Sequence, residues 1–114
     1  MTSSILEDES AFHSRVDALL QAIEVSFDDV DADIDCELTG GILTLTFANQ
    51  SKVIINRQTP NREIWVAAKS GGFHFKWQAP PEGKWRDTRS GETLAILLTR
   101  VISAQAEIVI SITI

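Results

Sequence analysis

Negative charge is concentrated in one short stretch of the sequence, "FDDVDADIDCE", at residues 27–37. Six of these eleven residues are carboxylates and none is basic, so the side chains repel one another unless something binds them. Three explanations fit such a cluster: a metal site, a contact surface for a basic partner, or a solvated face that keeps a small domain soluble.

The segment before this cluster has the periodicity of an amphipathic helix. Between about Ser10 and Asp28 the apolar side chains fall on one face at about 100° per residue. These apolar residues are Phe12, Val16, Leu19, Leu20, Ile23 and Phe27. The helix could begin after Ser4, Asp8 or Ser10, each of which is a suitable N-cap.

A ridge of polar side chains follows one flank of this predicted helix. Its members are His13, Asp17, Glu24 and Asp28. Their successive spacings place them within about 60° of one another on the helix surface. Asp28 and Asp29 also lie at the helix C-terminus, where the dipole is already negative and a carboxylate costs about 0.3–1 kcal/mol. Because these acids reduce local stability, we favour binding over solubility as their role.

The ligand types indicate which ions such a surface would take. Carboxylates with one imidazole suit Fe, Mn, Mg or Ca rather than Cu(I). An EF-hand is excluded, because Ile34 occupies the position of its glycine and Gly40 that of its bidentate glutamate. We therefore expect weak, multi-site binding that decreases as ionic strength rises.

The charge of the whole chain is divided between two regions. Residues 1–37 hold eleven of the sixteen acids and one base, Arg15, whereas the remainder holds nine bases and five acids. An acidic region of this kind repels nucleic acid and anionic membranes, and it attracts cations and basic protein surfaces. Aromatic and basic residues do not alternate along the sequence as a nucleic-acid-binding surface would require.

Length and composition predict one domain over residues 1–114, with a flexible N-terminus at about 1–7 and a tail at about 107–114. No apolar run approaches the roughly 20 residues that span a membrane, and the first residues lack the features of a secretory signal. The single cysteine, Cys36, cannot form an internal disulfide. We therefore expect a cytoplasmic protein.

Short alternating runs predict about six antiparallel strands after the first helix. The runs are "DIDCELT", "ILTLTF", "KVIINRQ", "IWVAAK", "FHFKW" and a short run around Trp85. A second helix is predicted from an N-cap at Ser90 to about Ala106, and the β-branched tail "EIVISITI" favours a strand. This order predicts an α+β two-layer sandwich with both helices on one face of the sheet.

Three segments of the sequence, "DIDCE", "NRQTPNREIW" and "DTRSGETL", together resemble the bacterial branch of the frataxin family. The similarity runs from about Phe12 to Ala106 in the same order of elements. It implies a non-catalytic protein that binds iron, Fe²⁺ or Fe³⁺, weakly and acts in iron–sulfur cluster assembly. It also implies that other divalent or trivalent cations can substitute, and that a cysteine desulfurase and its scaffold protein are the partners.

The resemblance also implies which residues bind. The implied metal ridge consists of Glu24, Asp28, Asp29, Asp31, Asp33 and Asp35, with His13 and Asp17 near its start. Val25 stands where bacterial relatives often have a second acid, which predicts fewer bound ions here. The implied partner surface consists of Asn56, Gln58 and Trp65, and we add Glu37 from the solvent side of the first strand. The apolar tail extends past the matched region and is implied to pack near the helices and affect stability.

Several alternatives remain open at this stage. The acidic ridge could oxidise iron with O₂ as a weak ferroxidase, although exposed ligands disfavour catalysis. The chain could instead bind its partners without metal. Alternation predicts a buried Cys36 and an exposed His74, for which a metal role is the minor interpretation. Without metal we expect a monomer.

Overall fold

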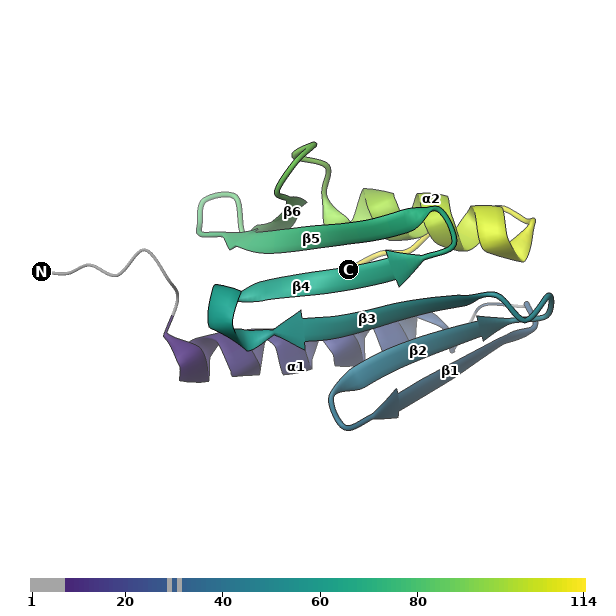
Figure 1. Cartoon of the computed structure of the whole chain (residues 1–114), viewed down its shortest axis with the longest axis horizontal. Helices are drawn as coiled ribbons and strands as arrows, with labels where there is room; N and C mark the ends of the chain where they lie inside the picture. The colour runs from purple at the N-terminus through teal and green to yellow at the C-terminus, as the bar shows by residue number, and fades with distance from the viewer. Residues whose placement is uncertain (1–7, 29, 31) are drawn as a thin grey trace, which may run out of the picture.

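The computed structural model describes residues 8–28, 30 and 32–114, so the predicted flexible N-terminus lies outside the described residues. The helical and strand elements are α1 (Glu9–Ser26), β1 (Ile34–Thr39), β2 (Ile42–Phe47), β3 (Lys52–Gln58), the 3-10 helix η1 (Thr59–Asn61), β4 (Glu63–Ala68), β5 (Gly71–Gln78), β6 (Lys84–Asp87) and α2 (Leu94–Ala106). All six strands form one antiparallel sheet in the order β1-β2-β3-β4-β5-β6. Both helices cover the same face of this sheet (Figure 1), which confirms the predicted two-layer sandwich.

The core lies between the sheet and the two helices. Alternate residues of the central strands point inward and are fully buried, as Leu43 and Leu45 of β2 and Val53 and Ile55 of β3 illustrate. They meet the apolar stripe predicted for α1, which is buried at Phe12, Val16, Leu19, Leu20 and Ile23. Each fully buried side chain of this size contributes about 1.5–3 kcal/mol to the free energy of folding. Neither α1 nor α2 is long and apolar enough to span a bilayer.

Asp8 caps the first helix. Its carboxylate accepts a hydrogen bond from the Ala11 N–H at 3.1 Å, and the helix begins at Glu9. Of the three candidate caps, this is the one that the structure uses. At the other end, the Phe27 N–H donates to the Glu24 carbonyl at 3.2 Å and the Asp28 N–H donates to the Val25 carbonyl at 3.0 Å, which completes the last turn.

The predicted N-cap of the second helix at Ser90 is wrong. Thr93 caps α2, because its side chain accepts the Ile96 N–H at 3.4 Å. Ser90 belongs to the preceding turn, where the Asp87 carboxylate accepts the N–H groups of Arg89 at 2.6 Å and Ser90 at 3.2 Å. Aspartate commonly organises turns in this way, and the turn delays the helix by three residues.

The prediction that the C-terminal tail forms a strand is also wrong. Residues 107–114 run against the helix layer without pairing to a strand, and Ile110 and Ile112 are buried. Two hydroxyls of α2 accept hydrogen bonds from the backbone of the tail. The Ser103 Oγ accepts the Ile110 N–H at 2.9 Å, and the Thr99 Oγ1 accepts the Ile112 N–H at 3.0 Å. The alternation that suggested a strand instead places two isoleucines against the core.

Candidate metal and partner surface

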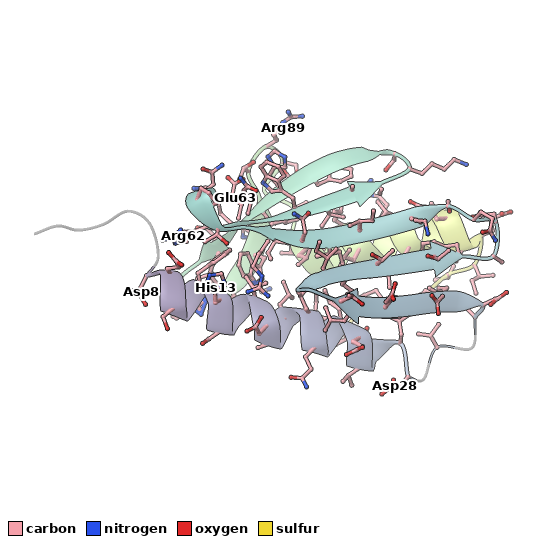
Figure 2. The ribbon with its side chains drawn as sticks, turned by 60° about the horizontal axis from the view of Figure 1, so that its bottom comes forward. Asp8, His13, Asp28, Arg62, Glu63 and Arg89 are labelled. Atoms are coloured by element: carbon pink, nitrogen blue, oxygen red, sulfur yellow. The ribbon has the colours of Figure 1, made fainter. Side chains whose placement is uncertain are left out.

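Carboxylates from two elements gather at one end of the sandwich. Glu24 lies half-buried in the last turn of α1, Asp28 follows the end of that helix, and Asp33 and Asp35 are exposed at the start of β1. We call these four residues the acidic surface. The predicted ligands Asp29 and Asp31 lie outside the described residues. Figure 2 shows Asp28 beyond the end of α1, projecting away from the body of the molecule.

The acidic surface affects the pKa of a neighbouring side chain, the Cys36 thiol. It is half-buried on β1, opposite Leu45, rather than fully buried as predicted. Burial, and after it the negative charges of Glu24, Asp35 and Asp28, together raise the pKa of the Cys36 thiol to about 11. Three carboxylates from the two elements therefore act on one point. Since the thiol keeps its proton near neutral pH, it is a poor metal ligand.

The acidic surface is an open collection of oxygens rather than a cage. Among the described residues, no group of three or more His, Cys, Asp or Glu side chains is arranged to hold a metal ion. Within the same part of the chain, the four carboxylates of the acidic surface form no ion pair with a basic side chain. Their charge is therefore left to solvent and to whatever cation or basic partner approaches.

The other end of α1 is electrostatically different, because Arg57 of β3 compensates its acid. Its guanidinium forms an ion pair with Asp17 at 2.5 Å and donates a hydrogen bond to the His13 Nδ1 at 2.8 Å. A guanidinium can only donate, so the His13 Nδ1 accepts and its lone pair is occupied. The His13 Nε2 lies 3.7 Å from a Glu9 oxygen. The alternation of "KVIINRQ" predicts that Arg57 lies on the helix-facing side of its strand with Val53 and Ile55, but it does not reveal these contacts.

His13 and Asp28 cannot share one ion. His13 lies thirteen residues before Ser26, the last residue of α1, which at 1.5 Å per residue is about 20 Å, and Asp28 lies beyond that end of the helix. Figure 2 places His13 near Asp8 and Arg62, toward the opposite end of α1 from Asp28. The predicted ridge therefore divides into a compensated half at His13 and Asp17 and the uncompensated acidic surface.

The predicted partner residues lie on the face of the sheet away from the helices. Asn56 is paired with Trp65 across β3 and β4, and Gln58 is paired with Glu63. Glu37 occupies the same outward face on β1, which lies three strand spacings or about 14 Å across the sheet from β4. The surface therefore extends across most of the width of the sheet.

Trp65 is held in a fixed orientation by two neighbours. Its indole Nε1 donates to a Glu63 oxygen at 2.7 Å, and its ring stacks on His74 with centroids 4.3 Å apart and planes 10° from parallel. Trp65 is half-buried, so it is partly covered by its neighbours rather than fully exposed. Glu63 is 8% exposed and had no assigned role in the sequence analysis. Its outward position opposite Gln58 was the signal that could have identified it.

The fold and these surfaces together define a helix–sheet–helix sandwich with an uncompensated acidic end. Comparison with known proteins gives the family. The sequence signature described as the frataxin-like domain matches residues 6–108. This chain belongs to the frataxin-like family, and its curated relatives are bacterial proteins of the CyaY type.

Two relatives illustrate the similarity in sequence. The iron–sulfur cluster assembly protein CyaY of Tolumonas auensis is 48% identical over 98 residues, which cover 86% of this chain and 91% of that protein. The protein of the same name from Pseudomonas aeruginosa is 50% identical over 98 residues, with coverage of 86% and 90%.

Two solved structures illustrate the similarity in fold. Frataxin from Psychromonas ingrahamii superimposes with a TM-score of 0.85 at 35% identity, over 95% of this chain and all of that one (100%). Trimeric frataxin from Saccharomyces cerevisiae, complexed with ferrous iron, gives a TM-score of 0.65 at 28% identity, over 94% and 93% of the two chains.

Proposed function

We propose that this chain binds iron at its acidic surface and acts in iron–sulfur cluster assembly. In this role it is a regulator of, or an iron donor to, a cysteine desulfurase and its scaffold protein. The observation that carries the proposal is the convergence of Glu24, Asp28 and Asp35 on one end of the molecule, where no base of the described residues forms an ion pair with them. The relatives named for cluster assembly and the ferrous complex of the yeast protein support it.

The donor chemistry of the acidic surface suits iron as a transient cargo. Carboxylate oxygens are hard ligands that accept both Fe²⁺ and Fe³⁺, and other divalent or trivalent cations of similar hardness compete for them. Because Asp28, Asp33 and Asp35 are exposed and the described residues form no cage around an ion, bound iron keeps much of its water and exchanges readily. Binding is therefore weak, and Asp29 and Asp31 belong to the proposed ligand set by their place in the sequence.

The same charge also serves partner binding. A basic patch on the desulfurase would be attracted by the acidic surface, while Asn56, Gln58 and Trp65 face the scaffold, with Glu37 between the two contacts. A half-buried tryptophan with a fixed ring is a frequent centre of protein interfaces. We place the protein in the cytoplasm, as a monomer in the absence of metal, without a nucleic-acid or membrane partner.

A metal-independent interaction protein is the second candidate. The open arrangement of the acidic surface favours it, because an interaction surface needs charge but no coordination geometry. In that case the affinity for the desulfurase would be the same with chelator and with iron. The weak ferroxidase alternative predicts more than one oxidised iron per protein-bound iron under limiting protein, whereas a binding protein oxidises at most what it holds.

A charge-reversal experiment tests the main proposal. The double variant Asp28→Lys/Asp35→Lys should lose most Fe²⁺ binding and most affinity for the desulfurase, measured by anaerobic calorimetry. The matched control is Glu82→Lys/Glu92→Lys, which changes the net charge equally but at sites away from the acidic surface, beside Arg86 and Arg100. Equal iron and desulfurase affinities in the two double variants would refute the proposed site.

A further inference from the structure

We propose that a groove between the two helices binds a small organic anion with an aromatic body. The groove has a volume of about 360 Å³, within the range of roughly 300–1,000 Å³ that is typical of small-molecule sites. Its walls come from α1, from the β5–β6 hairpin, from the start of α2 and from the end of the tail. Principal lining residues are Arg15, Ala18, Ala22, Trp77, Trp85 and Ile114.

Small side chains on the facing flanks of the helices create the groove. Ala18 and Ala22 are one turn apart on α1, and Ala95 lines the same groove from α2. Large residues at these positions would fill the space between helices that are usually 8–10 Å apart. At roughly 100° per residue, Ala18 and Ala22 point about 120° and 160° away from Glu24 around the axis of α1. The groove is therefore separate from the acidic surface.

Two indoles form the floor on the sheet side. Trp77 and Trp85 are paired across β5 and β6, with ring centroids 5.6 Å apart and planes at 64°. Both point toward the helices, and Trp77 remains half-buried at the groove. Aromatic rings prefer offset or edge contacts with other rings, so this floor suits a flat aromatic guest. The branched side chain of Ile114 closes the margin without filling the space.

The charge of the groove selects an anion. Its lining includes Arg15 and Lys84, and no acidic residue lines it in the described part of the chain. Arg15 is the single base of the strongly acidic first 37 residues. Its guanidinium lies 4.4 Å from the centre of the Trp77 ring, so the positive charge is held against the aromatic floor. A carboxylate or sulfonate attached to an aromatic ring would place its charge near Arg15 and Lys84 and its ring on the indoles.

The three tryptophans of the chain make this site directly observable. Two lie at the groove, whereas Trp65 lies on the outer face of the sheet. In a titration with 2-naphthoate followed by ¹H–¹⁵N NMR, the indole N–H signals of Trp77 and Trp85 should shift saturably and that of Trp65 should not. The neutral analogue 2-naphthalenemethanol should bind at least about threefold more weakly, because it lacks the charge.

Matched variants distinguish this site from general attraction. Lys84→Glu should weaken 2-naphthoate binding about fivefold, whereas Lys52→Glu, on the outer face of β3, should leave it unchanged. Ala22→Phe fills the groove at an exposed helix position and should abolish saturable binding, whereas Ala67→Phe on β4 should not. Equal shifts of all three indole signals would overturn the proposal, as would equal binding by the members of either variant pair or by the neutral analogue. The site is independent of the proposed iron function, and neither result bears on the other.

Discussion

Neutralising the acidic surface should make Cys36 more reactive. Burial is the main reason that the pKa of this thiol is raised to about 11, and the charges of Glu24, Asp35 and Asp28 add to it. Because of this raised pKa, the Cys36 thiol of the folded protein keeps its proton at a pH where the thiol of an ordinary cysteine has lost it. At pH 9 a thiol with a pKa of about 11 is roughly 1% thiolate, whereas an ordinary cysteine is more than half ionised.

The magnitude of the charge effect follows from the exposure of the carboxylates. An exposed charge near a titrating group is worth about 0.2–1 kcal/mol, which is roughly a twofold change in thiolate population per carboxylate. The triple variant Glu24→Gln/Asp35→Asn/Asp28→Asn should therefore raise the thiolate fraction about tenfold at pH 9. Burial is unchanged in this variant, so the pKa should remain above that of a free cysteine.

Alkylation by iodoacetamide across pH 7–11 provides the assay. The apparent pKa, rather than the rate at one pH, is the quantity to compare, because limited access to a half-buried thiol lowers the rate equally at every pH. Glu82→Gln is the matched control, since it removes a carboxylate away from Cys36. If iron or Mg²⁺ binds at the acidic surface, saturating Mg²⁺ should lower the apparent pKa of the parent protein in the same direction.

An unchanged apparent pKa in the triple variant would refute this reasoning. It would mean that the three carboxylates do not converge on Cys36, and the acidic surface would then be scattered rather than gathered. A pKa that falls equally in the Glu82→Gln control would show that total charge, and not the local arrangement, sets the value.

Three further predictions concern stability and the sheet surface. Asp8→Ala should lower the free energy of unfolding by about 1 kcal/mol in urea titrations, because the cap on the Ala11 N–H is lost; no change would mean another residue caps α1. Ile112→Ala should cost about 2 kcal/mol or more, whereas Ile108→Ala at a half-exposed site should cost little; equal effects would show that the tail is not packed as described. Glu63→Ala should shift the Trp65 indole N–H signal by removing its acceptor, while Glu63→Gln should largely preserve it through the amide oxygen.

The periodicity of apolar residues predicted most of the fold, because the burial of apolar side chains determines which face of each helix and strand points inward. The apolar stripe of α1 and the alternation of Leu43 and Leu45 on β2 report directly which side of each element is buried. The same logic failed in the tail, where alternation is real but no strand lies beside it. There the hydroxyls of Thr99 and Ser103 replace strand partners, and nothing in the sequence pattern distinguishes these two ways of satisfying a backbone.

The candidate site was less predictable than the fold because contacts between distant residues decide it. Charge density alone identified the acidic surface, but it treated Asp17 and Asp28 as equivalent. The pairing of Asp17 with Arg57, forty residues away in sequence, separates them. Likewise, the alternation of "IWVAAK" predicts that Trp65 points away from the helices, whereas its half-buried state depends on His74 from the neighbouring strand.

The paired and unpaired acids along α1 suggest that the two halves of the helix have different roles. At its first half, Asp17 is paired with a base from the sheet and thereby fastens the helix to β3. At its second half, Glu24 and Asp28 lie where the helix dipole disfavours them and where the described bases do not pair with them. If selection acted only on stability, an acid at the helix C-terminus would be the easier one to replace, with lysine or arginine. The proposed binding of a cation or a basic partner would account for acids beside Asp33 and Asp35 at positions that stability alone disfavours. The pairing of Asp17 with Arg57 attaches the other half of the helix to the sheet.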